Sequence, residues 1–398
     1  MITAEKYLGS LEKFGINLGL ERVQKILEAL GNPQLDFSSI HIAGTNGKGS
    51  TAAMTASILK EAGYTVGLYT SPHLLSYTER IKVDNRDISP KEFNQGISLV
   101  KKIILKLQKK NKAFKPTVFE VLTAVAFWYF AKKEVQVAIV EVGMGGRLDA
   151  TNVLYPLVSV ITNVDYEHTE ILGKTLTAIA QEKAAIIKPG IPVVTAEAKS
   201  DPLKVIKAQA EKNLSVLQQV KAYPIYLTNL LGEHQKINAA CAVAAIKLAG
   251  IEVGQKQIEC GLRDTQWPGR LQIISRKPLI IVDGAHNPAG AKVLKEALRQ
   301  LFPGKFTVIF GCQATKDFCL IIKTLASIAK KFIITRSSNA QAQKQSLVLA
   351  SINKFKLCYE AKNLLEALKL WDRKTPLLIT GSLFLVADAI CELKRMRK

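Results

Sequence analysis

Short apolar runs alternate along the chain with longer segments in which apolar residues recur at helical spacing. In the first two thirds of the chain, the runs that predict strands are 39–43, 65–69, 135–141, 157–164 and 191–195. The segments between them predict amphipathic or buried helices. Strands that alternate with helices in this way are typical of a parallel α/β fold.

The pattern changes in the last third of the chain. Two helices are predicted at 234–250 and 255–263, and "TQWPGR" then interrupts any regular element. Strands follow at 279–282, 306–310 and 377–380. Because 398 residues is long for one core, we predict two α/β domains, 1–265 and a smaller 271–398, joined by a linker at 266–270.

The segment "HIAGTNGKGST" at 41–51 follows the first predicted strand and carries three glycines. Glycine permits backbone angles that turn successive N–H groups toward one point, and this arrangement suits an anion. Lys48 adds a positive charge, Ser50 adds a hydroxyl able to reach Mg²⁺, and the N-terminus of the next predicted helix faces the same place. We therefore predict that this segment binds a nucleotide polyphosphate.

The spacing of this segment departs from the usual phosphate loop, which has four residues between its first glycine and the Gly-Lys pair. Only Thr45 and Asn46 lie between Gly44 and Gly47. A tight turn would explain the glycines, but it needs neither the lysine nor the hydroxyls. We predict a variant loop whose phosphate-binding residues are Gly44, Thr45, Asn46, Gly47, Lys48, Gly49 and Ser50.

Polar side chains follow three of the predicted strands. Ser71 comes after the second strand, Glu141 ends the third, and His168 follows the fourth. Ligands of open parallel sheets bind at the carboxyl ends of the strands, and oxygen ligands with an occasional imidazole suit Mg²⁺ or Mn²⁺. A helix-capping role for Glu141 and a surface position for His168 are the alternatives to a metal site.

Lys183 lies on the apolar stripe of a predicted helix, "TLTAIAQEKAAIIK". Its stem either extends along the apolar surface to solvent or stays desolvated, which lowers the pKa of the amine. A neutral amine can react with carbon dioxide to give a carbamate, a second anionic metal ligand. Farther along, Asn238, Arg270, Asp283 and His286 could contact the nucleotide from the far side, although a tight turn explains "DGAHNP" almost as well.

Composition narrows the class of protein. The chain is 48% hydrophobic and 7% aromatic, as in ordinary globular proteins. Six cysteines without C-x-x-C spacing argue against structural zinc and disulfides and favour a reducing compartment. The N-terminus does not resemble a signal peptide, and the most apolar helix is too short to span a bilayer. We expect a cytoplasmic protein without a membrane partner.

The charge is strongly basic, with 55 Lys and Arg against 33 Asp and Glu, or +22. Such a balance is compatible with nucleic acid, an acidic membrane surface or polyanionic small substrates. Lysines gather in "VKKIILKLQKKNKAFK" at 100–115, a pattern most typical of a solvated helix face.

Eight segments, taken together and in order, resemble the folylpolyglutamate synthase and dihydrofolate synthase family of the Mur ligase superfamily. They are "HIAGTNGKGS", "SPHL…ERI", "EVGMGGRLDATN", "EKAAIIK", "GEHQKINAA", "WPGR", "DGAHNPAG" and "TGSLFLV". The resemblance implies an N-terminal P-loop ATPase-like domain with a mostly parallel sheet and a smaller C-terminal Rossmann-like domain. It also implies ATP-dependent addition of L-glutamate to dihydropteroate, to a folate, or to both.

The resemblance also implies roles for the candidate residues. Lys48 and its loop would hold the ATP phosphates. Asn238, Arg270, Asp283 and His286 would contact ATP. Ser71, Glu141 and His168 would ligate Mg²⁺, with two ions expected, and Lys183 matches a lysine that is carbamylated in related enzymes. Lys48, Lys183 and His168 are thus the expected catalytic residues, and a monomer that binds small molecules and no nucleic acid is expected.

The chain departs from the family pattern in four places. Ala185 stands where a glycine is usual, and Thr315 stands where an aspartate is more common. Glu167 stands where an aspartate is common, and the stretch between Lys212 and Gly232 is short. Two other functions remain open. A cell-wall Mur ligase usually carries an extra N-terminal domain, whereas about forty residues precede this loop. A P-loop ATPase that binds nucleic acid would suit the charge, but the sequence has no nucleic-acid-binding signature.

Overall fold

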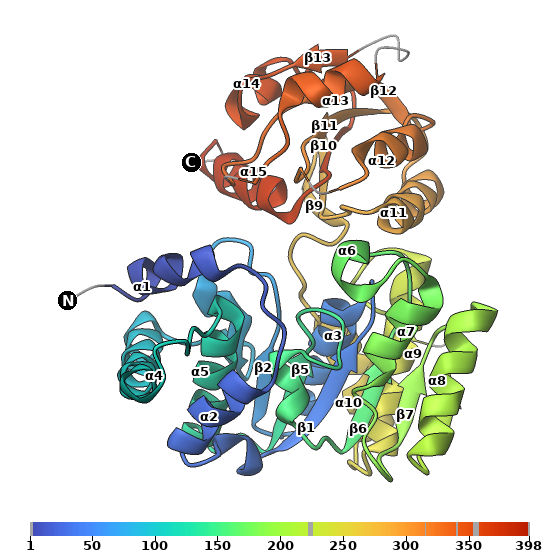
Figure 1. Ribbon diagram of the computed structural model, residues 1–398. Coiled ribbons are helices and arrows are strands. Elements are labelled where there is room, and N and C mark those ends of the chain that lie inside the picture. Colours follow the sequence, from blue (N-terminus) through green and yellow to red (C-terminus); the bar gives the residue numbers. More distant parts are fainter. Residues whose placement is uncertain (1–2, 222–225, 315, 340, 353–357, 397–398) are drawn as a thin grey trace. The chain divides into compact units, whose positions relative to one another are not determined.

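The computed structural model describes residues 3–221, 226–314, 316–339, 341–352 and 358–396. The chain forms two compact units (Figure 1). Unit 1 contains Met1–Asn229 and Lys236–Thr265, and unit 2 contains Leu230–Gln235 and Gln266–Lys398. Residues 230–235 therefore group with unit 2, although the sequence-based domain assignment placed them in the first domain.

Unit 1 is built on an eight-stranded sheet with the order β4-β3-β2-β5-β1-β6-β7-β8. The central strands β1 and β5 are parallel and almost wholly buried, which is typical of a sheet covered on both faces. At one edge, β3 and β4 run antiparallel to their neighbours. The strands are β1 Ser38–Ala43, β2 Val66–Tyr69, β3 Ile81–Val83, β4 Arg86–Asp87, β5 Val137–Glu141, β6 Val158–Ile161, β7 Val193–Thr195 and β8 Leu217–Gln219.

Helices pack on this sheet because each presents a buried apolar side. One apolar core joins α1, α2, α4 and α5 to the sheet, and another joins α6, α7 and α8 to it. The helices α3 and α10 pack against each other so closely that Gly261 of α10 approaches the backbone of Ile58 in α3. The helices are α1 Ala4–Leu11, α2 Glu21–Ala29, α3 Lys48–Glu61, α4 Pro90–Lys110, α5 Val118–Lys132, α6 Thr169–Leu172, α7 Leu176–Ala184, α8 Ser200–Lys212, α9 Glu233–Leu248 and α10 Gln255–Asp264.

Unit 2 has a six-stranded sheet with the order β13-β12-β11-β14-β10-β9, in which the edge strand β9 is antiparallel to β10. Its core lies between the sheet and the helices α11 and α12. The elements are β9 Gln272–Arg276, β10 Leu279–Asp283, α11 Pro288–Leu301, β11 Phe306–Phe310, α12 Phe318–Leu325, β12 Ala329–Ile334, α13 Gln345–Ile352, β13 Cys358–Glu360, α14 Leu364–Lys369, β14 Leu377–Thr380 and α15 Leu383–Arg395.

The predicted α/β fold with mostly parallel sheets is confirmed. All five strands predicted for the first domain are present, with slightly different ends. The strands β3, β4 and β8 were missed because each has only two or three residues and lacks a long apolar run. Within the described residues, no helix has the length and apolar character needed to cross a membrane.

Candidate active site

The loop between β1 and α3 has a backbone shape that requires glycine. Gly44 has φ of 144° and Gly47 has φ of 86°, both in the region that side chains disfavour. A Cβ at Gly44 would lie 1.9 Å from Thr162 Oγ1, and one at Gly47 would lie 2.4 Å from Asn238 Oδ1. The two glycines therefore let neighbouring side chains approach the loop, and Asn238 is one of these neighbours.

Two residues after β6 hold the loop in place. Asn163 accepts hydrogen bonds from the backbone N–H of Thr45 at 2.9 Å and, through Oδ1, from that of Asn46 at 2.9 Å. The Thr162 hydroxyl donates to the Asn46 carbonyl at 2.7 Å. The sequence analysis missed both residues, although their position after the strand "LVSVIT" is the signal that selected the metal candidates.

Lys48 is the first residue of α3 and folds back over the loop. Its Nζ donates to the carbonyl oxygens of Gly44 at 2.9 Å and Thr45 at 3.3 Å. The side chain is half-buried, and Ser50, two residues later in the same turn, is 4% exposed. An ammonium group and the positive end of a helix thus occupy the same place, where a phosphate would be stabilised.

Glu141 and Ser71 come together because β5 and β2 are neighbours in the sheet. The Ser71 backbone N–H donates to Glu141 Oε2 at 3.0 Å, and Glu141 is 4% exposed. His168 precedes α6 and has φ of 45°. The structure thus brings two of the three predicted metal ligands into direct contact.

These residues fit a magnesium ion that is held mainly by phosphate and water. Within the described ranges, no three His, Cys, Asp or Glu side chains form a cluster able to hold a metal alone. Mg²⁺ retains several waters and is usually bound through one or two carboxylates plus substrate phosphates. One carboxylate and one serine beside a phosphate loop are therefore a suitable donor set.

Lys183 is buried on α7, with a side chain that is 1% exposed. Its Nζ donates to the Gly44 carbonyl at 3.0 Å and to the carboxylate of Glu167. The alternative in which Lys183 extends to solvent is therefore wrong, since the amine turns inward to the phosphate loop. Burial lowers the Lys183 pKa to about 8, although the nearby Glu167 carboxylate opposes this shift.

Glu167 is the partner that the sequence analysis did not place in the site. Burial alone would raise the pKa of this carboxyl, but the charges of Lys183 and Lys48 outweigh burial and lower the pKa to about 2. Glu167 is thus an anion at neutral pH, next to His168 and to the ammonium of Lys183. The Glu167 carboxylate thus gives the site a buried negative charge without carbamylation of Lys183.

A second group follows β2. The Arg80 Nε–H donates to His73 Nδ1 at 2.9 Å, and the Arg80 guanidinium lies 5.5 Å from the centre of the Tyr77 ring. Burial and the Arg80 charge together lower the His73 pKa to about 4. His73 is therefore a neutral acceptor that fixes the arginine.

Unit 2 brings Asp283 and Arg270 together at the end of β10. Asp283 accepts from the backbone N–H groups of Leu271 at 2.7 Å and Ala285 at 2.8 Å. Burial raises the Asp283 pKa, and the Arg270 charge opposes this shift. His286 Nδ1 lies 2.9 Å from the Gly284 carbonyl oxygen, so Nδ1 carries a proton and donates it.

Comparison with known proteins gives the family. The model for the Mur ligase middle domain matches residues 42–218, and that for the Mur ligase glutamate ligase domain matches residues 269–383. The dihydrofolate synthase/folylpolyglutamate synthase of Bacillus subtilis is 34% identical, with 98% of each chain covered. The chain belongs to the folylpolyglutamate synthase and dihydrofolate synthase family. The expected family is thereby confirmed.

Solved structures of this family share the fold. Folylpolyglutamate synthase from Thermotoga maritima has a TM-score of 0.87 and 35% identity, covering 98% of this chain and 96% of that one. The E. coli protein named FolC, solved in complex with DHPP and ADP, has a TM-score of 0.90 and 28% identity. It covers 100% of this chain and 99% of its own. The matched regions include residues of both units.

Proposed function

We propose that this chain is an ATP-dependent ligase that adds L-glutamate to dihydropteroate or to a folate through an acyl phosphate. The observation that carries the proposal is the glycine-shaped loop with Lys48 in unit 1. The contact of Ser71 with Glu141 in the same unit supports it. The family relationship over nearly the full length and the ADP in the E. coli complex support ATP as co-substrate.

The chemistry explains why ATP is needed. A free carboxylate does not form an amide in water because its leaving group would be oxide. One oxygen of the acceptor carboxylate therefore attacks the γ-phosphorus of ATP, and ADP leaves. In this step the loop amides and Lys48 hold the phosphates in line and stabilise charge on the transferred group.

The second step forms the amide bond. The α-amine of L-glutamate attacks the acyl carbon, loses a proton, and expels inorganic phosphate from the tetrahedral intermediate. Water would destroy the acyl phosphate, so the reaction needs a site from which water is excluded. Asn238 in unit 1 and Arg270, Asp283 and His286 in unit 2 are the further residues that we propose as ATP contacts.

Magnesium has a place in the proposal. Ser71, Glu141 and His168 would hold it, and when bound it would neutralise charge on the phosphates. We propose that Lys183 acts as a positioning residue, because its ammonium fixes both the Gly44 carbonyl and Glu167. Carbamylation of Lys183 is the competing proposal. It requires a neutral amine and therefore loss of this ion pair.

The proposed enzyme acts as a monomer in the cytoplasm. All six cysteines are free, as suits a reducing compartment.

The test is to incubate the purified protein with ATP, Mg²⁺ and L-glutamate, and to offer dihydropteroate and tetrahydrofolate in parallel. Release of phosphate that requires both glutamate and an acceptor is expected, and the faster acceptor identifies the substrate. Phosphate release that depends on neither glutamate nor an acceptor, but increases when nucleic acid is added, would instead favour an ATPase that acts as a switch.

A further inference from the structure

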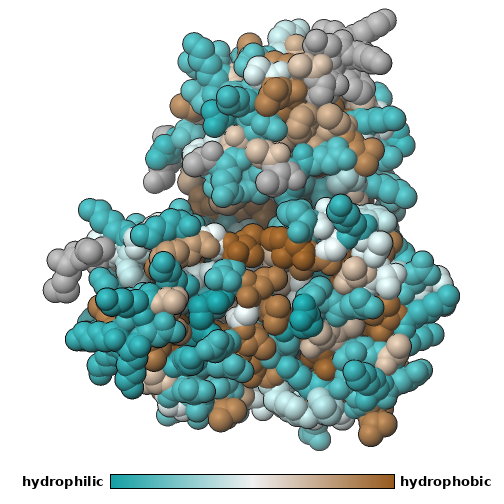
Figure 2. Space-filling model, viewed as in Figure 1, coloured by the Kyte–Doolittle hydropathy of each residue, from teal (hydrophilic) through white to brown (hydrophobic). Residues whose placement is uncertain are grey.

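The helix α4 carries a concentration of positive charge that the proposed reaction does not use. Residues 99–115 include seven lysines and no acidic residue. Figure 2 shows the face of unit 1 that carries α4 as largely hydrophilic. Other lysines of this unit have carboxylate partners, such as Lys133 with Glu92 at 2.8 Å. The lysines of 99–115 form a basic surface in which the charges repel one another.

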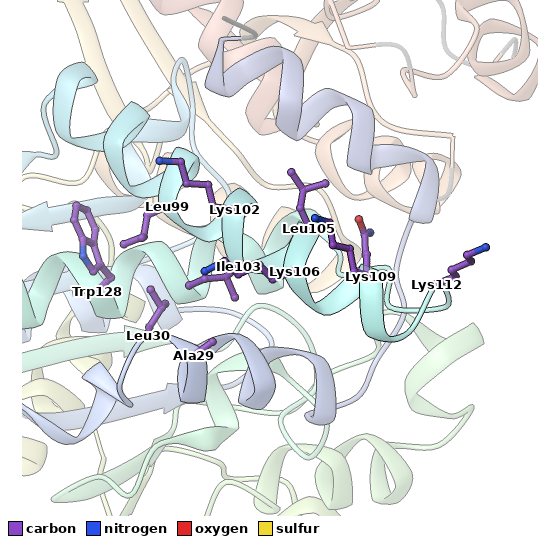
Figure 3. Close-up of a pocket in the computed structure, with 11 residues that line it drawn as sticks. Ala29, Leu30, Leu99, Lys102, Ile103, Leu105, Lys106, Lys109, Lys112 and Trp128 are labelled. Atoms are coloured by element: carbon purple, nitrogen blue, oxygen red, sulfur yellow. The ribbon is translucent and has the colours of Figure 1, made fainter.

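Part of this surface borders a groove, here called the lysine groove, of about 930 Å³ between α4 and the helices α2 and α5 (Figure 3). Its floor is apolar and includes Leu30 from the end of α2, Ile103 from α4 and Trp128 from α5. Lys102, Lys106 and Lys109 from α4 line it as well. The groove therefore combines a hydrocarbon floor with a row of ammonium groups.

The three lysines of the row are available for binding. Each is exposed, and no carboxylate of the described residues lies within 4.0 Å of Lys102, Lys106 or Lys109. Their stems lie beside apolar side chains while the charged ends stay in solvent, as long cationic residues commonly do. An anionic ligand would relieve their mutual repulsion without first breaking an ion pair.

The spacing of the row suits a chain with regularly repeated carboxylates. A rise of 1.5 Å per helical residue places Lys102 and Lys106 about 6 Å apart along α4, and Lys106 and Lys109 about 4.5 Å apart. In an extended γ-linked glutamate chain, five backbone bonds separate successive carboxylates, which gives a repeat of roughly 6 Å. Three successive carboxylates span about 12 Å, which matches the length of about 10.5 Å from Lys102 to Lys109 along the helix.

We propose that the lysine groove binds the oligo-γ-glutamyl chain of a folylpolyglutamate at a second site. This proposal rests on the proposed function, because that reaction makes such chains. A γ-linked chain carries two methylene groups per residue in its main chain. These methylenes would lie on the floor formed by Leu30, Ile103 and Trp128, while the α-carboxylates reach the lysines. An α-linked chain presents peptide groups to the same floor and loses this match.

The test uses tetra-γ-glutamate labelled with fluorescein and lacking a pteridine, added to the full chain without nucleotide at physiological salt. Fluorescence anisotropy measures its affinity. The triple variant Lys102→Gln/Lys106→Gln/Lys109→Gln should weaken binding about tenfold or more, since three charge contacts of ordinary strength are lost. The variant should keep its circular dichroism spectrum and its rate of glutamate addition to a monoglutamate acceptor.

The matched control removes three exposed lysines from α8 in the same unit, as Lys204→Gln/Lys207→Gln/Lys212→Gln. It carries the same change in net charge and should bind the probe within about twofold of the unmodified protein. The α-linked tetraglutamate should bind several-fold more weakly than the γ-linked one.

Two results would overturn the proposal. Equal losses in the two triple variants would show that only total charge matters, and equal binding of the two tetraglutamates would remove the role of the apolar floor. Because the probe lacks a pteridine and ATP is absent, neither result bears on the ligase reaction, which the phosphate-release assay tests separately.

Discussion

The two units place polar residues at the carboxyl ends of parallel strands, but they hold these residues in different ways. In unit 1, Lys183 reaches the Gly44 carbonyl across 139 positions of sequence, and Glu141 reaches the Ser71 amide across 70. In unit 2, Asp283 binds backbone groups at most 12 positions away, and His286 lies beside a carbonyl two positions away. The first arrangement is built by the tertiary fold, and the second by a local turn.

From this difference we infer that unit 1 supplies most of the catalytic groups of the proposed reaction. Unit 1 buries full charges, because Lys183 and Glu167 both remain ionised against the cost of burial. A fold keeps such charges where they serve a ligand or hold one another in position. In unit 2 the turn after β10 satisfies its own polar atoms, so we assign that turn a smaller share of the reaction.

The largest effect should come from the phosphate and metal candidates of unit 1. Lys48→Ala and Glu141→Ala should each reduce glutamate-dependent ADP release by about 10³-fold or more, because charge on the transferred phosphoryl group loses its stabilisation. Lys60→Ala, at the exposed end of the same helix α3, is the control and should keep its activity. Full activity in Lys48→Ala or Glu141→Ala would remove the assigned roles.

The buried ion pair gives the next effect. Lys183→Met leaves the Glu167 carboxylate buried without its partner and should lower the free energy of unfolding by about 3 kcal/mol. The double variant Lys183→Met/Glu167→Leu should recover much of this loss in urea unfolding. If the double variant is no more stable than the single one, the pair does not hold this region together.

The same lysine separates the positioning role from the carbamate. In a carbamylated enzyme, short carboxylates such as formate should partly restore the activity of Lys183→Ala, because they replace a lost anionic ligand. The ion pair with Glu167 predicts no restoration, since the missing group is then a cation. Activity assays with and without added formate distinguish the two, and recovery of activity would favour the carbamate.

A smaller effect is expected in unit 2. Asp283→Asn keeps one acceptor for the amides of Leu271 and Ala285 but loses the other, which should cost about 1–3 kcal/mol in stability. Activity should fall by about tenfold, far less than for Glu141→Ala. A loss as large as that of Glu141→Ala, with stability unchanged, would contradict the distinction between the units.

The effect that is smallest at neutral pH, and that grows only on acidification, is a pH dependence of stability shared by both units. Burial, with a minor contribution from Lys188, lowers the pKa of His41 in unit 1 to about 3, and burial and Arg270 lower that of His234 in unit 2 to about 4. Between pH 6.5 and 4 these histidines bind protons in the unfolded chain but stay neutral in the folded protein. The free energy of unfolding therefore falls on acidification. The slope is about 1.4 kcal/mol per pH unit for each histidine. His234→Gln should flatten the urea-unfolding profile over this range, and an unchanged slope would show that His234 is not kept neutral.

The sequence was sufficient to predict those features that a single segment of the chain determines. The glycines around Lys48, the strand endings at Glu141 and Asp283, and the alternation of strands and helices are all local signals. Contacts between segments far apart in the chain could not be predicted from the sequence. Glu167 attracts notice only when the buried Lys183 beside it is seen, and Asn163 only when the loop is folded. Residues 222–225 of the shortened stretch and Thr315 lie outside the described residues.

The central claim is that an oxygen of the acceptor carboxylate attacks the γ-phosphorus held by the loop of unit 1. The most direct measurement labels that carboxylate with ¹⁸O and follows the label by mass spectrometry of the released phosphate. Transfer of one ¹⁸O atom into the phosphate is predicted, because the bridging oxygen leaves with phosphorus when glutamate attacks. Phosphate that carries no label, while amide product accumulates, would contradict the account.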